Sequence, residues 1–414
     1  MLETLSSFAG NFIIGTYTWS PKLVQTWLDA LYLRSPLLQR VFRYHLHPEF
    51  ANGGSIAELA RRCGLRVETH EVFAPDGHVL TLHRISKEGG GPKNGSSSSS
   101  SSRRRSSPRE TVLLLHGLMQ DAESFLAGGK SSLAATLVLE KDCDVWLANA
   151  RGSKYSQTST VHPVSSPKFW DFCIDDLVCD VPLLVDFVMK RGALGLKGKI
   201  ACVGFSQGSA LLSSAISKFP RLNECISLFV CLAPAVKPAG LAPSTLVSIV
   251  QSRPWLVPFL FGSRSMLDST FLWMRVLSAG GFAALSNGAM RFLFHWNLAQ
   301  ISLPRQARLF QHIYSPTSTR TIAHWFQIIN QKRLCTFDGM AVYDLTLIRC
   351  PVAVFAGGSD RLIDPAALCS VAKNVVHYHC EPDYEHLDLL WADSAPERIF
   401  KPLMDLLCPP SGDK

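Results

Sequence analysis

A serine flanked by glycines is the residue of this sequence best suited to chemistry. It is Ser206 in the pentapeptide Gly204-Phe205-Ser206-Gln207-Gly208, which follows an apolar run at 200–203 and precedes a helical run of small residues at 209–214. A serine hydroxyl becomes a nucleophile when a base removes its proton and a sharp strand-to-helix turn presents it. The flanking glycines let the two elements approach closely. The pattern predicts a nucleophile elbow rather than an ordinary Gly/Ser turn.

A carboxylate and a histidine follow this serine in the order Ser, Asp, His that a triad built on such an elbow requires. Asp360 comes after a strand-like run at 350–356 and a glycine turn, which puts it at the carboxyl edge of a predicted sheet. Asp364, one turn further on, is its nearest competitor. His386 follows another strand-like run at 375–379 and lies where a loop leads into a helix. We predict Asp360 as the triad acid and His386 as the general base.

An attacked carbonyl also needs backbone N–H donors already in place for its developing negative charge, and losing one such donor costs about 3 kcal/mol of barrier. The buried run 111–115 leads into His116-Gly117-Leu118. In proteins with a nucleophile elbow, the loop after such an early strand supplies one donor of the oxyanion hole. We therefore predict the N–H groups of Leu118 and Gln207 as the two donors.

Together with other motifs, these residues resemble the acid lipase family, which includes gastric lipase, lysosomal acid lipase and the fungal steryl ester hydrolases. The resemblance covers about residues 47–400 and looks closest to the fungal branch. It implies an α/β-hydrolase fold, with a mostly parallel central sheet and an inserted helical cap, and the same triad and oxyanion hole. The other motifs are His47 to Glu49, Val72 to Leu80, His116 to Asp121, Val145 to Gly152, Phe169 to Phe172, Ala323 to Gln327 and Glu385 to Asp388.

The cysteine pattern departs from the secreted members of that family, which carry a disulfide within the cap. The stretch expected to form the cap, residues 236–346, contains only Cys335, so a bridge within it is impossible. The twelve cysteines show no spaced pattern, and some, such as Cys202 and Cys350, lie in apolar runs. They are typical of small core residues in a reducing compartment rather than of a disulfide framework.

Length and composition predict a large globular enzyme, since 414 residues with 47% hydrophobic content can bury a substantial core. Of the net charge of +8, the segment 89–110 alone carries +4, so nucleic-acid binding is not indicated. We expect five parts: an N-terminal amphipathic segment at 1–46, the first part of the core at 47–235, the cap at 236–346, the second part of the core at 347–408, and a tail at 409–414.

Two segments are expected to lie outside the packed core. Residues 89–110 are rich in Ser, Gly and Arg, which predicts a disordered loop, and Ser106 and Ser107 follow three arginines in a manner that would suit a basophilic kinase. Residues 1–46 have no convincing cleavable signal, and large apolar side chains at helical spacing alternate there with basic ones. That pattern suits a helix in a membrane or lipid-droplet interface, although a helix packed on the core remains an alternative.

These observations favour a serine hydrolase that cleaves long-chain lipid esters, either steryl esters or triacylglycerols, with no cofactor and no metal. A non-catalytic lipid-binding or droplet-scaffold protein and an esterase of small soluble esters are the alternatives. The expected location is a membrane, a lipid droplet or the endoplasmic reticulum, facing the cytosol; a secreted or lysosomal/vacuolar location is the alternative. The sequence does not choose between the two lipid classes.

Overall fold

The computed structural model describes residues 54–88, 109–194, 198–241, 248, 251–257, 264–266, 270, 273–274, 277–364 and 366–409. The predicted N-terminal segment at 1–46, nearly all of the Ser/Arg-rich segment with Ser106 and Ser107, and the tail beyond residue 409 lie outside these residues. The division of the chain into five parts stays a prediction.

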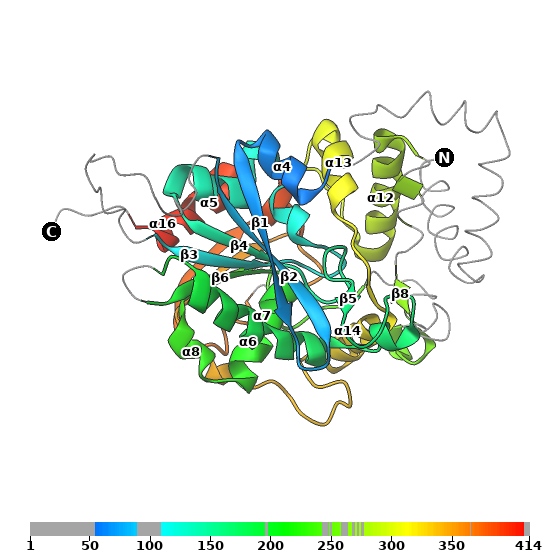
Figure 1. Cartoon of the computed structure of the whole chain (residues 1–414). Coiled ribbons are helices and arrows are strands. Elements are labelled where there is room, and N and C mark those ends of the chain that lie inside the picture. The colour runs from blue at the N-terminus through cyan, green and yellow to red at the C-terminus, as the bar shows by residue number, and fades with distance from the viewer. Residues whose placement is uncertain are drawn as a thin grey trace, which may run out of the picture.

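A mostly parallel sheet forms the centre of the described structure (Figure 1). Strands β4, β3, β6, β7, β10 and β11 run parallel, whereas β2 pairs antiparallel with both β1 and β4, and the short β5 (Thr158–Ser159) pairs with β2. The sheet order is β1 (Leu65–Phe73), β2 (His78–Lys87), β4 (Asp144–Ala148), β3 (Thr111–Leu115), β6 (Ile200–Phe205), β7 (Ile226–Leu232), β10 (Val352–Gly357) and β11 (Val375–Glu381).

Helices cover both faces of this sheet. Figure 1 shows α5 (Leu133–Lys141) and α16 (Lys401–Leu407) on one side, and α6 (Ile174–Arg191), α7 (Gln207–Lys218) and α8 (Leu222–Cys225) on the other. Every residue of β3, β4, β6 and β10 is buried, as expected for parallel strands covered on both faces. The remaining helices of the core are α4 (Ile56–Arg62) and α15 (Asp388–Trp391), and short 3-10 or π turns lie at Ala122–Phe125, Gly129–Ser131, Pro167–Trp170, Leu345–Leu347 and Pro396–Phe400.

The chain between β7 and β10 supplies a second group of helices, where we expected the cap. The described part contains α12 (Ala279–Phe294), α13 (Leu303–Leu309), a 3-10 turn at Phe310–His312 and α14 (Thr319–Gln331). The two-stranded pair β8 (Ser265–Met266) and β9 (Thr317–Ser318) completes it. Ser278 and Ser318 start α12 and α14, because their side chains accept hydrogen bonds from backbone N–H groups of the first turn.

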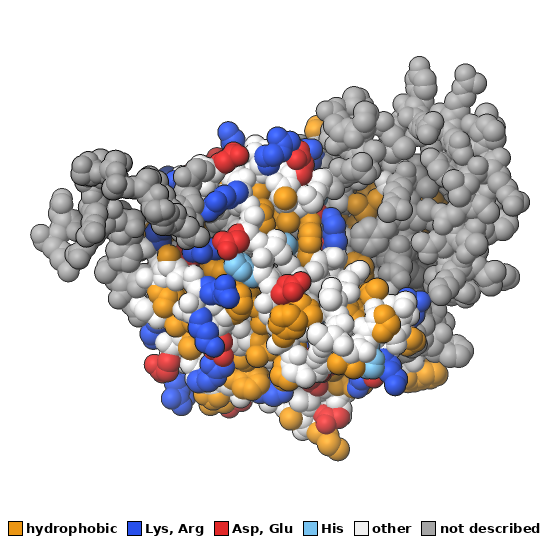
Figure 2. Space-filling view, in the orientation of Figure 1, with side chains coloured by type: hydrophobic (Ala, Val, Ile, Leu, Met, Phe, Trp, Pro, Cys, Tyr) orange, Lys and Arg blue, Asp and Glu red, His pale blue; other side chains and the backbone are white. Residues whose placement is uncertain are grey.

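On the face shown in Figure 2, Lys and Arg side chains lie among acidic, hydrophobic and uncharged ones. No helix in the described ranges is both long enough and apolar enough to cross a bilayer. Cys202 and Cys350 are buried in the core, as the sequence predicted.

Candidate active site

Ser206 lies in a strained turn between β6 and α7. Its φ of 52° falls in the left-handed region, which non-glycine residues adopt rarely and which recurs at functional sites. Both flanking glycines are required by close approaches. A Cβ on Gly208 would lie 2.2 Å from the carbonyl oxygen of Leu115, and one on Gly204 would lie 2.5 Å from the backbone nitrogen of Ser209. The turn therefore presses the start of α7 against the end of β3.

Asp360 and His386 follow the parallel strands β10 and β11, at the same carboxyl edge of the sheet as Ser206. The Nε2 atom of His386 lies 2.7 Å from Ser206 Oγ, and its Nδ1 atom lies 2.6 Å from Asp360 Oδ2. All three residues are buried. Asp360 follows β10, and its other oxygen accepts a hydrogen bond from the N–H of Leu362. The three residues thus form a continuous hydrogen-bonded chain.

The competing carboxylate lies elsewhere. Asp364 is 38% exposed at its side chain and pairs with Lys237 at 3.1 Å, while its other oxygen accepts from the N–H of Ala366. The helix expected to begin at His386 is α15, which begins two residues later, at Asp388. His386 therefore sits in the turn before the helix.

The loop after β3 carries Leu118 close to the elbow. Gly117 donates its N–H to the side-chain oxygen of Gln120 at 3.0 Å, and Met119 has a φ of 59°. Gln207 is the first residue of α7, and N–H groups in the first turn of a helix have no partner within the helix. The packing of Gly208 against Leu115 brings this helix start to the loop. The arrangement suits the two N–H groups of Leu118 and Gln207 for binding one anionic oxygen.

His116 helps to fix the same loop. Its Nδ1–H donates to the carbonyl of Gly117 at 2.8 Å, and its Nε2 accepts the N–H of Ala150 at 3.0 Å. This pattern requires the neutral imidazole, and burial lowers the pKa of His116 to about 4. His116 is therefore a structural residue of the loop.

The chain between β7 and β10 contacts both halves of the candidate oxyanion hole. Trp325 on α14 donates its indole N–H to the side-chain oxygen of Gln207 at 2.7 Å. Ser315 donates its N–H to the carbonyl of Met119 at 2.8 Å. The side chain of Ser315 in turn accepts the N–H of Lys154 at 2.7 Å. Both donor segments are thus held by residues that are distant in sequence.

A buried charged cluster supports the next turn of that loop. Glu123 receives hydrogen bonds from Lys154 at 2.6 Å, from His312 at 2.8 Å and from Tyr155. Burial pulls the pKa of Glu123 upward, but these partners outweigh it and hold the pKa below its usual range. Burial raises the pKa of the neighbouring Asp121. His312 ties the turn at 310–312 to this part of the core.

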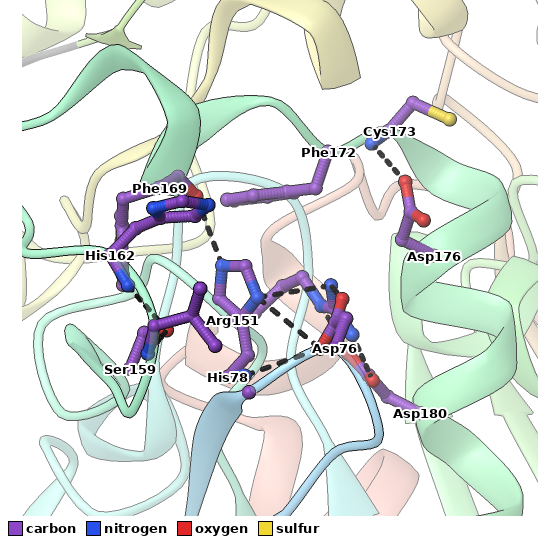
Figure 3. Close-up of polar contacts among 12 residues, drawn as sticks. Asp76, His78, Arg151, Ser159, His162, Phe169, Phe172, Cys173, Asp176 and Asp180 are labelled. Carbon is purple, nitrogen blue, oxygen red and sulfur yellow. Dashed lines mark hydrogen bonds and ion pairs between the residues drawn. The ribbon is translucent and has the colours of Figure 1, made fainter.

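The buried Arg151 forms a second polar network, in the loop after β4 (Figure 3). Its guanidinium binds the carboxylate of Asp180 in a bidentate way, at 2.7 and 2.5 Å, and reaches Asp76 at 2.5 Å. His78, beside Asp76, bonds to the carbonyl of Phe169 at 2.9 Å. The network joins the β1–β2 turn, the loop after β4 and α6, and therefore fixes the loop that carries Ala150.

Asp388 is a buried carboxyl group next to the triad. One oxygen accepts the N–H of Glu385 at 2.7 Å, whereas the other is buried without a hydrogen-bond partner. Burial, together with the nearby carboxylates of Glu385 and Asp360, raises the pKa of Asp388 to about 7. The group therefore holds its proton to a higher pH than an exposed carboxyl group does.

One cluster has the residue types of a metal site. Ligand atoms of Cys173, Asp175 and His324 lie within 4.8 Å of one another. The carboxylate of Asp175 accepts from Phe337 and Tyr343, and His324 bonds to a backbone carbonyl at 2.8 Å. These hydrogen bonds already orient the cluster within the protein, and the triad geometry makes no use of it.

The structure brings together Ser206, Asp360 and His386 and sets Leu118 and Gln207 beside the nucleophile turn. Sequence reasoning gave no role to Trp325, Ser315 or Arg151. Trp325 and Arg151 lie in stretches that carried the family resemblance, which was the available signal. The partners of Trp325, Ser315 and Arg151 are 118, 196 and 29 or more residues away. No local pattern identifies such contacts.

Two family models match this chain. One, described as the partial alpha/beta-hydrolase lipase region, matches residues 56–129, and the other, described as the alpha/beta hydrolase fold, matches residues 110–393. A "Probable lipase" of Schizosaccharomyces pombe is 34% identical over 376 residues, which cover 85% of this chain and 80% of the relative. Gastric triacylglycerol lipase of Bos taurus is 27% identical over 375 residues, which cover 85% of this chain and 91% of that lipase.

Solved structures agree on the fold. A crystal structure from Sulfolobus solfataricus matches with a TM-score of 0.54 at 11% identity, over 83% of this chain and 94% of that one. At this identity the likeness concerns the fold alone. The longer family match includes the nucleophile turn and the segments that carry Asp360 and His386.

Proposed function

Because this chain belongs to the acid lipase family of α/β-hydrolases and is a carboxylic ester hydrolase, we propose that it cleaves long-chain lipid esters through an acyl-enzyme on Ser206. The observation that carries this proposal is the hydrogen-bonded chain from Ser206 through His386 to Asp360. Its order, spacing and burial match the needs of nucleophilic catalysis by a serine.

The proposed reaction has two halves. His386 Nε2 takes the proton of Ser206 Oγ as the oxygen attacks the ester carbonyl, and the tetrahedral oxyanion accepts hydrogen bonds from the N–H groups of Leu118 and Gln207. The intermediate collapses, and the departing alcohol takes the proton from His386. Water then attacks the acyl-enzyme with the same base, releasing the fatty acid and restoring Ser206.

Asp360 acts through the imidazole. Its carboxylate accepts the Nδ1–H of His386, which leaves Nε2 free to accept the serine proton, and it stabilises the imidazolium that forms in each half-reaction. Each oxyanion donor contributes about 3 kcal/mol to lowering the barrier. The contacts of Trp325 and Ser315 support this proposal because they hold both donor segments before substrate arrives.

An apolar cluster that packs against Leu118 and Met119 of the oxyanion loop supports a preference for long acyl chains. Val257, Ile322 and Ala323 are buried there, and partly buried apolar side chains pack against them. Those side chains are Leu118, Met119, Met266, Phe326 and Phe337. Because most of a bound lipid must be covered by apolar side chains, apolar packing around Leu118 is compatible with steryl esters or triacylglycerols as substrates.

Hydrolysis of triolein and cholesteryl oleate by the purified protein, measured side by side, tests the substrate class. We expect release of oleate from one or both, and no release by a Ser206→Ala variant prepared in parallel. A series of p-nitrophenyl esters of increasing chain length should show kcat/KM rising toward long chains. Activity confined to short soluble esters would overturn the proposed lipid substrates but not the assignment of the protein as an ester hydrolase.

We also propose that the enzyme works on a membrane or lipid-droplet surface that faces the cytosol. The apolar and basic side chains of residues 1–46, which lie outside the described residues, support this location. Each fully buried large side chain contributes roughly 1.5–3 kcal/mol to docking. Removing residues 1–45 should release the enzyme from lipid surfaces and slow hydrolysis of emulsified ester, while activity on a short soluble ester survives. Retention on membranes, or loss of both activities, would contradict this role.

A further inference from the structure

The segment that follows α12 covers one face of the His386 imidazole. The indole of Trp296 lies nearly parallel to that ring, with 5.2 Å between ring centroids and 10° between planes. Phe294 stacks on Trp296 at 4.4 Å, and Phe205 of the elbow packs against the imidazole at 5.3 Å with a tilt of 49°. His386 is thus enclosed by aromatic rings from two distant parts of the chain.

Glu385, the neighbour of His386, holds this segment. Its buried carboxylate accepts the N–H of Asn297 at 2.9 Å to each oxygen and the N–H of Leu298 at 2.8 Å. His295 and Leu298 have φ values of 58° and 53°, in the left-handed region. A backbone held in that region by non-glycine residues needs such contacts to persist. The carboxylate therefore fixes the short stretch that presents Trp296.

We propose that Trp296 is a positioning residue for His386 and that Glu385 keeps it in place. This inference rests on the proposed role of His386 as general base. The bonds to Asp360 and Ser206 hold the two ring nitrogens but not the tilt of the ring, which the parallel indole fixes. The electron-rich indole face also attracts the imidazolium that forms in each half-reaction.

The stack has a catalytic consequence that differs from simple packing. A misplaced base slows proton transfer without weakening the binding of substrate, and a shift of about 1 Å can cost 10²-fold in rate. Loss of the stack should therefore lower kcat and leave KM nearly unchanged. A residue that merely lined the substrate site would change KM, and one that merely stabilised the fold would change the melting temperature.

Trp296→Leu and Trp296→Phe, assayed on a short soluble ester, test the proposal. We expect kcat to fall about 10- to 100-fold in the leucine variant. The phenylalanine variant keeps an aromatic face and should retain most of the activity. The rate of labelling by a fluorophosphonate should fall in parallel with kcat. Trp255→Leu, at an exposed tryptophan, is the matched control and should behave as the parent protein.

A double-mutant cycle tests the part played by Glu385. Glu385→Gln should lower kcat as Trp296→Leu does, and the two changes together should cost little more than either alone, because they disrupt one unit. Glu397→Gln is the control for Glu385→Gln, because Glu397 is an exposed glutamate in the turn that follows α15. If Glu385→Gln does not fold, the two Trp296 variants still decide the proposal.

Two results would overturn the inference. One is a leucine variant with unchanged kcat, and the other is equal loss in the leucine and phenylalanine variants. If the effects of Trp296→Leu and Glu385→Gln on kcat are additive, Glu385 does not act through Trp296. Failure of the proposed function is distinguishable, because it would appear as activity in Ser206→Ala or as absence of serine labelling in the unaltered protein.

Discussion

Replacing Asp388 by asparagine should stabilise the protein at neutral and alkaline pH. The carboxyl group is fully buried, and one of its oxygens has no hydrogen-bond partner. Asparagine has nearly the same shape and keeps an oxygen that can accept the N–H of Glu385. It also resembles the protonated carboxyl group at every pH, so the variant avoids placing a negative charge in this site.

The size of the effect follows from the pKa of Asp388, which burial raises from 3.8 to about 7. Because the folded-state pKa lies above the unfolded value, the folded protein holds the proton more tightly. The corresponding stability is fully present below about pH 3.8 and is lost as the pH rises through about 7. At about 1.4 kcal/mol per pKa unit, the shift corresponds to about 4 kcal/mol. Relaxation around the charge reduces this, and we expect about 2–4 kcal/mol.

The assay is unfolding by urea at a series of pH values from 4 to 8, followed by tryptophan fluorescence. The difference in free energy of unfolding between Asp388→Asn and the unaltered protein should grow in favour of the variant from pH 4 to 7 and stay constant above pH 7. Asp383→Asn, on the exposed part of the same loop, should show no such rise. A difference for Asp388→Asn that does not change with pH would refute the reasoning.

Three further outcomes are expected. Asp360→Asn should lower kcat about 10³- to 10⁴-fold because the imidazole loses its correct tautomer. Asp364→Asn should change kcat by less than about threefold, since it removes only an exposed ion pair. Equal losses of kcat in the two variants would leave the triad acid unassigned. Arg151→Met should lower the free energy of unfolding by about 3–5 kcal/mol, because Asp180 is left buried without its partner, and an unchanged urea midpoint would contradict this. Deleting residues 91–107 should leave the melting temperature and soluble-ester activity close to those of the parent protein. The reason is that Lys87 and Arg109, on either side of the segment, both pair with Asp142 and so hold its ends together. A large fall in melting temperature would show that the segment is part of the packed structure.

The sequence predicted those features that depend on local pattern and chain order. Buried runs at 111–115 and 200–203 form β3 and most of β6, and the glycine turn after 350–356 puts Asp360 beside His386. Short apolar runs between turn residues are reliable in this way because a parallel strand covered on both faces must be apolar throughout. The choice of Asp360 over Asp364 followed from its position directly after the strand.

Other features of the site depend on contacts between distant segments. Trp296 meets His386 across 90 residues, and Glu385 meets Leu298 across 87. An aromatic residue in an apolar segment has the same appearance in a sequence whether it packs in the core or covers a catalytic base. The raised pKa of Asp388 likewise comes from burial that only the folded chain creates. These features required the three-dimensional structure.

Identification of the residue that carries the acyl group tests the central claim most directly. The purified protein should react with a fluorophosphonate at a single site, and peptide mass spectrometry should find the adduct on Ser206. Ser206→Ala should take up no label and release no fatty acid from triolein or cholesteryl oleate, while its melting temperature stays close to that of the parent protein. Labelling of a different residue, or retained ester hydrolysis by the folded Ser206→Ala variant, would contradict the account.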